Sequence, residues 1–221
     1  MSKHITRVLI WSGWFRLSHL FIGGSVLVLL ATGSLISHSP FNAALVLDLH
    51  HYASGFLTTG LLIRLALMIK GQPQERFGNL IPKPSELRSI REMLRFYLLF
   101  GKAPLPKWYA QNPFWKLIYL AFYMIISLQV LSGLMMSDGA HLLGFYMPSV
   151  HLFWSNVLLT LSLAHIINVI WLEYKGRNND ISAIIHGEKT FISESSHHSN
   201  KTESPLTFTP MKTSTNKDKL K

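Results

Sequence analysis

Long apolar stretches with very few charged residues dominate the first 172 positions of the chain. Four of them, at about residues 17–36, 49–69, 114–136 and 150–172, match the roughly 20 apolar residues that a helix needs to cross a bilayer. The first stretch is long for the apolar part of a signal peptide, and no clear cleavage site follows it. The pattern therefore predicts an all-α membrane protein built as a four-transmembrane-helix bundle.

The distribution of Lys and Arg predicts how this bundle is oriented. Residues 1–16 contain three of them, residues 70–116 nine and residues 173–221 eight, whereas the connections 37–48 and 137–149 contain none. Positively charged loops stay on the cytoplasmic side of a membrane. We therefore expect both termini and the central loop to be cytoplasmic, in a bacterial inner membrane, and the two short connections to face outward.

The central loop and the C-terminal segment have different patterns. Between residues 87 and 100, three arginines recur at helical spacing beside apolar residues, which predicts a basic amphipathic helix on the inner leaflet. After about residue 193 the chain is rich in Ser, Thr, Lys and Asn without periodicity. The sequence thus predicts a membrane domain over residues 1–192 and a disordered cytoplasmic tail over residues 193–221.

Composition and charge narrow the class further. Charged residues make up 14% of the chain, against about 25% in soluble domains, so a soluble enzyme is not expected. The net charge of +10 comes from residues that flank apolar segments, which favours anionic membrane lipid over nucleic acid as a partner. The absence of cysteine excludes disulfides, thiolate metal sites, iron–sulfur clusters and covalent haem attachment.

Histidines within the predicted spans are the candidate functional residues, because ligating groups in a bilayer are costly. His151 and His165 are 14 residues apart, on nearly the same face of the fourth span and about 21 Å apart along its axis. His19 lies at the inner depth, and His50 or His51 at the outer depth. Two His–His pairs at two levels predict two noncovalent b-type haems, whereas a single metal ion needs its ligands at one level.

The choice between His50 and His51 is open, because adjacent helical residues point about 100° apart and only one can face a given haem. Gly55, one turn after His51, leaves room on that face and favours His51. Arg16 and Arg64 lie toward the inner ends of their spans. They either extend to the lipid headgroups or compensate the charge of haem propionates.

A short internal repeat links the first and third spans. Residues 30–33 (Leu-Ala-Thr-Gly) resemble residues 130–133 (Val-Leu-Ser-Gly), and both lie near the outer end of an outward-running span. Small residues there allow a neighbouring helix or a flat cofactor to approach closely. Tight helix packing and cofactor binding explain the repeat equally well.

Several motifs, taken in order and spacing over about residues 5–192, identify a family resemblance. They are Trp-Phe-Arg-Leu-Ser-His at 14–19, Ala-Thr-Gly at 31–33, His-Tyr-Ala-Ser-Gly at 51–55, Asn-Pro at 112–113, Leu-Ser-Gly at 131–133, His151, His165 and Ser-Ala-Ile-Ile-His-Gly at 182–187. With them the chain resembles the cytochrome b subunits of membrane-bound nickel–iron hydrogenases and their relatives in formate dehydrogenases and thiosulfate reductases.

The resemblance implies a di-haem, quinone-reactive membrane anchor. In that family the inner haem would be bound by His19 with His165 and the outer haem by His51 with His151, the same pairs that depth suggests. Related subunits have a quinone site near the inner haem, with a loop asparagine before the third helix. Here that residue would be Asn112, although Asn-Pro is also an ordinary turn.

These observations predict an electron-transfer subunit of a respiratory oxidoreductase complex, with no catalytic residues of its own. It would carry electrons between the quinone pool and a periplasmic redox partner: a c-type cytochrome, a ferredoxin-like subunit or a hydrogenase small subunit. The short outer connections favour a smaller partner than a hydrogenase. The alternatives are a small ion or metal transporter whose histidines bind ions, and a passive membrane anchor without haem.

Overall fold

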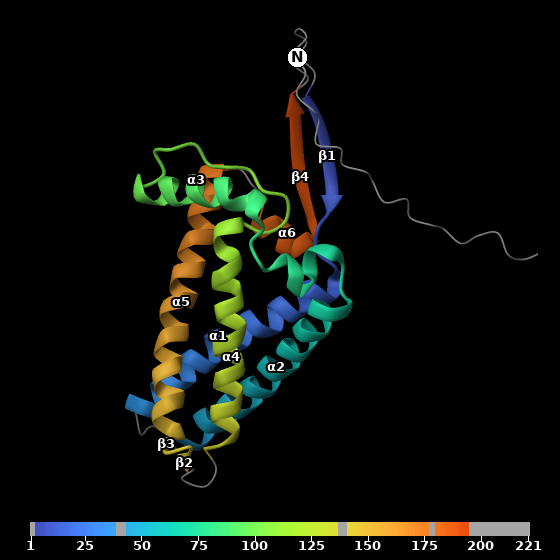
Figure 1. Ribbon diagram of the computed structural model, residues 1–221. Coiled ribbons are helices and arrows are strands. Elements are labelled where there is room, and N and C mark those ends of the chain that lie inside the picture. The colour runs from blue at the N-terminus through green and yellow to red at the C-terminus, as the bar shows by residue number, and fades with distance from the viewer. Residues whose placement is uncertain (1–2, 39–42, 137–140, 177–179, 195–221) are drawn as a thin grey trace, which may run out of the picture.

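The computed structural model describes residues 3–38, 43–136, 141–176 and 180–194, and four long helices form most of it (Figure 1). These helices are α1 (Gly13–His38), α2 (Ala43–Lys70), α4 (Lys116–Leu134) and α5 (Met147–Gly176). Each is long and apolar enough to cross a membrane. The prediction of an all-α membrane protein with four transmembrane helices is therefore confirmed.

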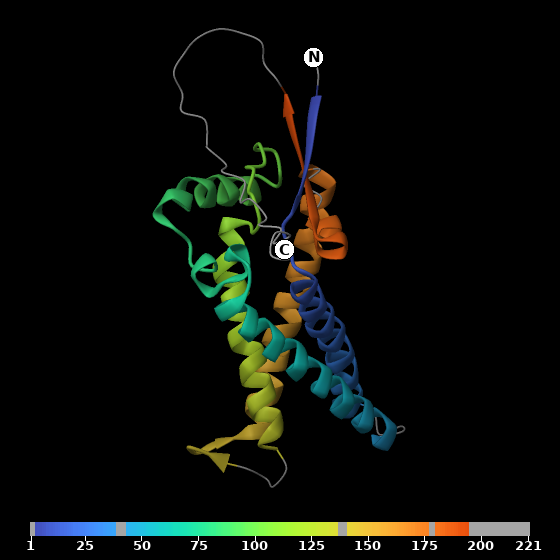
Figure 2. The same ribbon diagram turned by 90° about the vertical axis from the view of Figure 1, so that its right-hand side faces the viewer.

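The four helices form two hairpins that cross each other. Helix α1 packs along α2, and α4 packs along α5, while α2 and α4 bring the hairpins into contact (Figures 1 and 2). The core lies where all four helices meet, and its buried members are Val26, Leu57, Leu61, Ile125, Ile126 and Leu158. Many Leu, Ile and Phe side chains on the outer faces of the same helices are exposed. Such large apolar surfaces suit contact with lipid.

The two ends of the bundle differ in structure. At the end that we call the basic end, α1 begins, α2 ends, α4 begins and α5 ends, and the helix α3 (Leu87–Leu98) lies across the bundle (Figure 1). Met93 and Phe96 of α3 are almost fully buried and pack with Trp171 and Leu172 of α5. The helix predicted in the central loop is thus present. The opposite end, the short-loop end, has a small hairpin of β2 (His141–Leu142) and β3 (Phe145–Tyr146).

The remaining short elements are all at the basic end. Four 3-10 helices lie in the connections before α4, namely η1 (Pro73–Glu75), η2 (Phe77–Asn79), η3 (Pro84–Glu86) and η4 (Pro113–Trp115). A short helix, α6 (Asp180–His186), follows α5. These elements close the basic end of the bundle around the polar residues described below.

A two-stranded ribbon at the basic end was not predicted. Strand β1 (Lys3–Leu9) pairs antiparallel with β4 (Glu188–Glu194), and the ribbon extends away from the helices (Figure 1). Gly187 connects α6 to β4 in the left-handed conformation, with φ of 89°, which favours glycine. Its carbonyl accepts hydrogen bonds from the backbone N–H groups of Ile10 (2.8 Å) and Trp11 (3.1 Å).

The ribbon changes the boundary of the predicted tail. Ser193 and Glu194, the first two residues of that tail, are the last residues of β4 and pair with His4 and Lys3. The remainder of the predicted tail lies outside the described residues. Regular structure therefore reaches Glu194, two residues into the segment predicted as a tail.

Candidate functional site

His50 of α2 and His151 of α5 face each other toward the short-loop end. Their ring centroids are 6.4 Å apart and their planes are inclined by 65°. Two imidazoles that bind one metal ion from opposite sides, with bonds of about 2.0–2.1 Å, hold their ring centroids roughly 6–6.5 Å apart. The observed spacing therefore fits one iron atom between the two rings.

A hydroxyl group lies against the Nδ1 atom of each of these histidines. Thr32 Oγ1 of α1 is 2.8 Å from His50 Nδ1, and Ser132 Oγ of α4 is 2.9 Å from His151 Nδ1. Metal-binding histidines usually use their second ring nitrogen for a hydrogen bond of this kind. With Nδ1 engaged in both rings, Nε2 is the atom left for a ligand.

The side chain of His51 lies on a different face of α2. His51 is exposed, whereas His50 is half-buried and precedes the buried Ala53 and Leu57 by one and two turns on the same helical face. The structure thus brings His50 to His151. The sequence argument from Gly55 favoured His51, and the geometry favours the alternative that was left open.

The inner pair has a different environment. His165 is enclosed by the rings of Trp115, Tyr119 and Phe122, at centroid distances of 5.8, 6.0 and 5.8 Å. Its Nδ1 atom is buried without a hydrogen-bond partner among the described residues, which is costly for a polar atom unless a ligand or water satisfies it. His19 of α1 lies within electrostatic range of His165. His19 and His165 are therefore candidates for a second ligand pair.

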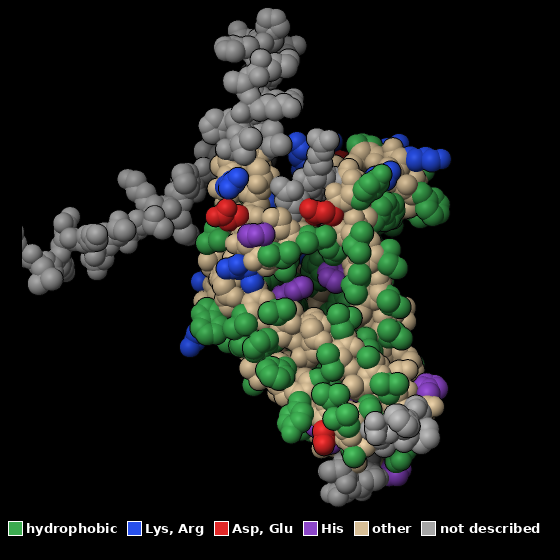
Figure 3. Space-filling view, turned by 180° about the vertical axis from the view of Figure 1, so that it is seen from behind, with side chains coloured by type: hydrophobic (Ala, Val, Ile, Leu, Met, Phe, Trp, Pro, Cys, Tyr) green, Lys and Arg blue, Asp and Glu red, His purple; other side chains and the backbone are tan. Residues whose placement is uncertain are grey.

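His19 of α1 combines exposure with a crowded environment. Its side chain has a large solvent-accessible surface although protein atoms surround it closely. Figure 3 shows histidine side chains at a hollow among apolar side chains, on the half of the molecule nearer the basic end. On α5, His165 lies about 21 Å along the helix axis from His151, at the rise of an α-helix.

Both predicted arginines are anchored to the protein. Arg64, 1% exposed, donates from Nε to the Tyr123 hydroxyl (3.0 Å) and from Nη1 to the Glu75 carbonyl (2.7 Å). Arg16 donates from Nη1 to the Ile185 carbonyl (2.8 Å). Arg64 Nη2 and Arg16 Nε are buried and have no partner in the part of the chain that the structure describes. Each guanidinium therefore retains an N–H group that suits a carboxylate.

Glu75 is a buried acidic residue that the sequence analysis did not single out. Its side chain is fully buried and accepts hydrogen bonds from the backbone N–H groups of Ser12 (2.8 Å) and Gln72 (3.0 Å). The carboxylate thereby joins the loop after α2 to the start of α1. The only signal in the sequence was an isolated acidic residue shortly after a span, which is common on exposed loops.

Asn112 has both a structural contact and a free donor. Its Oδ1 atom accepts a hydrogen bond from the Phe114 backbone N–H (3.0 Å), so it caps η4 as an ordinary turn residue. Its Nδ2 atom is buried and has no hydrogen bond of standard length to a described residue, and the Tyr97 hydroxyl lies close to the side chain. The side chain therefore still presents a donor to a small acceptor molecule.

A half-buried tyrosine lies near Asn112 and was also missed by sequence reasoning. The Tyr97 hydroxyl donates to Asn168 Oδ1 (2.7 Å) and accepts from Trp115 Nε1 (2.8 Å). Burial raises the pKa of Tyr97 although its hydrogen bonds oppose this, so the phenol stays protonated at neutral pH. Asn168 follows His165 by one helical turn, and Trp115 contacts His165. These polar groups thus adjoin the inner pair.

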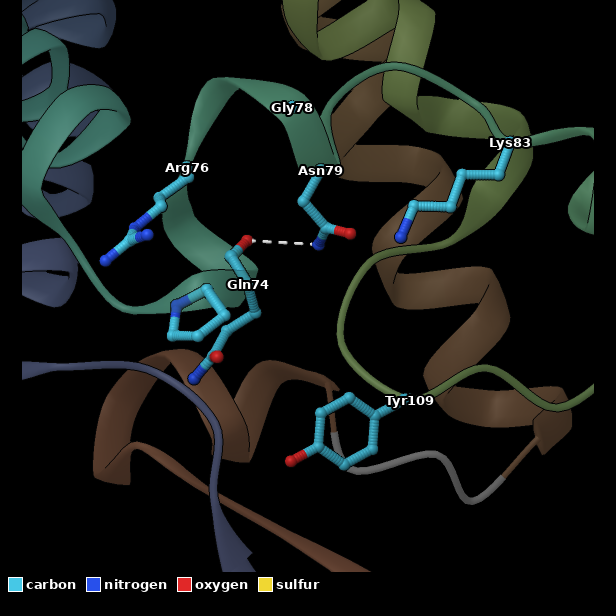
Figure 4. A pocket seen from close by; sticks show the side chains of 7 residues that line it. Gln74, Arg76, Gly78, Asn79, Lys83 and Tyr109 are labelled. Carbon is cyan, nitrogen blue, oxygen red and sulfur yellow. Dashed lines mark hydrogen bonds between the residues drawn. The ribbon is translucent and has the colours of Figure 1, made fainter. Parts of the chain in front are cut away.

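A separate open pocket of about 420 Å³ lies in the loop between α2 and α3 (Figure 4). Gln74, Arg76, Asn79, Lys83 and Tyr109 line it together with Pro73 and Gly78, and Asn79 Nδ2 donates to the Gln74 carbonyl (3.3 Å). None of the four candidate ligands borders this pocket, so it is distinct from the histidine pairs.

Fold and site together define a class: a multi-pass helical membrane protein with histidines inside its helical bundle. The family model of prokaryotic cytochrome b561 matches residues 10–187, and the chain belongs to this family. It is therefore a membrane b-type cytochrome, and its family implies that it binds haem b. No match was found among curated proteins or solved structures.

Proposed function

We propose that this cytochrome carries electrons across the bacterial inner membrane through two haem b groups. His50 and His151 would bind the outer haem, and His19 and His165 the inner one. The observation that supports this best is the 6.4 Å spacing of the His50 and His151 rings. Haem iron supplies the one-electron redox chemistry, and the polypeptide supplies ligands and electrostatics.

The arginines at the basic end would hold the propionates of the inner haem. Arg64 contacts Phe15, one turn before His19, with its guanidinium 4.9 Å from the ring centroid. Arg16 precedes His19 by three residues, so it lies on a neighbouring part of the same face. The buried free N–H groups on both side chains support this assignment.

The quinone pool would exchange electrons beside the inner pair. A quinone has carbonyl oxygens that accept hydrogen bonds, and Asn112 presents a buried, free Nδ2 donor. The Tyr97 hydroxyl, which donates to Asn168 Oδ1, would lie close to it and orient the polar groups of the site. Because the Lys and Arg distribution places the basic end in the cytoplasm, protons would be exchanged with the cytoplasm.

A periplasmic redox partner would dock at the short-loop end, nearer the outer pair. It would be a c-type cytochrome, a ferredoxin-like subunit or a hydrogenase small subunit. The side chains of Leu143 and Phe145, in the β2–β3 hairpin, are 89% and 65% exposed and offer an apolar contact. Aromatic and aliphatic anchors of this type are common at protein interfaces.

Haem content tests the proposal. The protein purified in detergent, after expression with sufficient haem, should contain two b-type haems per chain in a pyridine haemochrome assay and show low-spin reduced-minus-oxidised bands. His151→Ala and His165→Ala should each leave one haem. A colourless wild-type protein would refute the proposal and favour an ion transporter or a passive anchor.

A further inference from the structure

The two hairpins contribute matching halves to the outer histidine pair. In the first half, the hydroxyl of Thr32 on α1 lies 2.8 Å from Nδ1 of His50 on α2. In the second half, the hydroxyl of Ser132 on α4 lies 2.9 Å from Nδ1 of His151 on α5. In both halves, a residue near the end of one helix contacts a histidine near the start of the next.

A glycine follows the hydroxyl residue in both halves and lies beside the same atom of the ring. A methyl group on Gly33 would be 3.6 Å from His50 Cε1, and one on Gly133 would be 3.4 Å from His151 Cε1. Both distances correspond to van der Waals contact. The repeat of Thr-Gly and Ser-Gly in the sequence is therefore also a repeat in space, on either side of one candidate iron site.

The hydrogen bonds of Thr32 define which nitrogen of His50 carries the proton. Thr32 Oγ1 donates its one hydrogen to the Val28 carbonyl at 2.8 Å, so toward His50 it accepts from Nδ1–H. With Nδ1 protonated, the neutral ring has its lone pair on Nε2, the atom available for iron.

The second half has the same arrangement. Ser132 Oγ donates to the Gln129 carbonyl (3.2 Å) and accepts from His151 Nδ1–H. Gln129 also donates from Nε2 to the backbone carbonyl of His151 (3.1 Å), which holds the start of α5 against α4. Both hydroxyls are thus placed to orient an imidazole that carries its proton on Nδ1.

We propose that Thr32 and Ser132 are positioning residues that set the midpoint potential of the outer haem; this inference rests on the proposed function. A hydroxyl that accepts the Nδ1 proton makes the imidazole a more basic ligand. A more basic ligand stabilises ferric over ferrous iron. The two hydroxyls together therefore lower the potential of the outer haem.

Redox titration of the full-length protein tests this inference. Thr32→Val and Ser132→Ala should each raise the midpoint potential of the outer haem and leave that of the inner haem unchanged, and the double variant should show a larger rise. Thr58→Val and Ser127→Ala are matched controls, because these hydroxyls donate to a backbone carbonyl of their own helix, at 2.8 and 2.7 Å. The controls should keep both potentials.

Variants that keep the hydroxyl separate positioning from packing. Thr32→Ser and Ser132→Thr should retain both haems and a potential near the wild-type value, even if Thr32→Val or Ser132→Ala loses the outer haem. Two bound haems with unmoved potentials in Thr32→Val and Ser132→Ala would overturn the inference and leave the proposed function standing. The absence of haem from the wild-type protein would instead overturn the proposed function itself.

Discussion

Replacing His50 and His51 one at a time with alanine distinguishes two ligand assignments that differ by a single residue. The His50 ring faces His151 at 6.4 Å, whereas His51 is exposed on another face of α2. His50→Ala would leave His151 without its opposite ligand. We therefore expect His50→Ala to bind one haem per chain instead of two, and His51→Ala to bind two.

The expected loss is a loss of haem and not of the folded protein. His50→Ala removes the hydrogen bond to Thr32, a contribution of about 1 kcal/mol, and some packing at a half-buried position. The core where the four helices meet, around Leu57 and Ile126, is unchanged. The folded His50→Ala protein should thus show about half the wild-type haem absorbance per chain.

The assay is haem per chain by pyridine haemochrome, together with reduced-minus-oxidised spectra of each variant in detergent. The spectrum that remains in His50→Ala should match that of His151→Ala, because both variants lack the same haem. If His50→Ala kept both haems while His51→Ala lost one, the assignment from the structure would be refuted and His51 would be the ligand.

Two further predictions concern the basic end. Lys116 Nζ bonds both oxygens of Glu86 (2.6 and 2.9 Å), and Lys116 is only 2% exposed. Glu86→Gln should therefore destabilise the protein by roughly 1–3 kcal/mol in thermal unfolding, which is less than the loss of a fully buried pair. The control Glu92→Gln removes an exposed pair with Arg88 and should have little effect. Burial raises the pKa of Glu86, but the hydrogen bond and charge of Lys116 lower it below its ordinary value. The stabilisation by the Lys116–Glu86 pair is thus complete above the ordinary carboxyl pKa and is lost as the pH falls through the lowered pKa of Glu86. If the stability of Glu86→Gln fell with pH as steeply as that of the wild-type protein, this prediction would be refuted. Tyr97→Phe removes a buried hydroxyl beside the proposed quinone site and should slow electron exchange with a quinone several-fold in stopped-flow measurements, with two haems retained; an unchanged rate would exclude a role for the hydroxyl.

The transmembrane helices could be predicted because a bilayer imposes a length and a composition on each span. The observed helices are mostly longer than the predicted ones; α1 begins at Gly13 where hydropathy indicated about residue 17. Hydropathy detects the part of a helix that lies in the hydrocarbon layer of the membrane, whereas helical hydrogen bonding continues through the headgroup region. Helix α3 was predictable for a different reason, since its apolar residues follow the helical period.

The ribbon of β1 and β4 could not be predicted in the same way. Its strands are about 180 residues apart in the chain, and the pairing of Leu9 with Glu188 depends on both ends reaching the same end of the bundle. Each strand is short and contains charged residues. The local signal of β-branched residues is weak, and the register depends on tertiary structure.

The sequence left His50 and His51 as alternatives because α2 is apolar on all sides. In such a helix, hydrophobic periodicity does not identify the buried face, and small or polar residues mark the helix contacts instead. Gly55 was one such local signal. The better one was the Thr-Gly and Ser-Gly repeat, whose hydroxyls contact His50 and His151, but its role depends on which helices are neighbours.

The different surroundings of the two histidine pairs predict two different midpoint potentials. Both outer histidines have an Nδ1 hydrogen bond to a hydroxyl, which favours ferric iron. At the inner pair, the guanidinium of Arg64 lies 4.9 Å from the ring centroid of Phe15, which precedes His19 by one turn, and a nearby cation favours ferrous iron.

The hydrogen bonds at the outer pair and the cation near the inner pair both favour a higher midpoint potential at the inner haem. Electrons should therefore move favourably from the short-loop end to the basic end. His151→Ala, which keeps the inner haem, should retain the higher of the two wild-type potentials in a redox titration. If His151→Ala instead retained the lower potential, ligand hydrogen bonding and nearby cations would not set which haem has the higher midpoint potential.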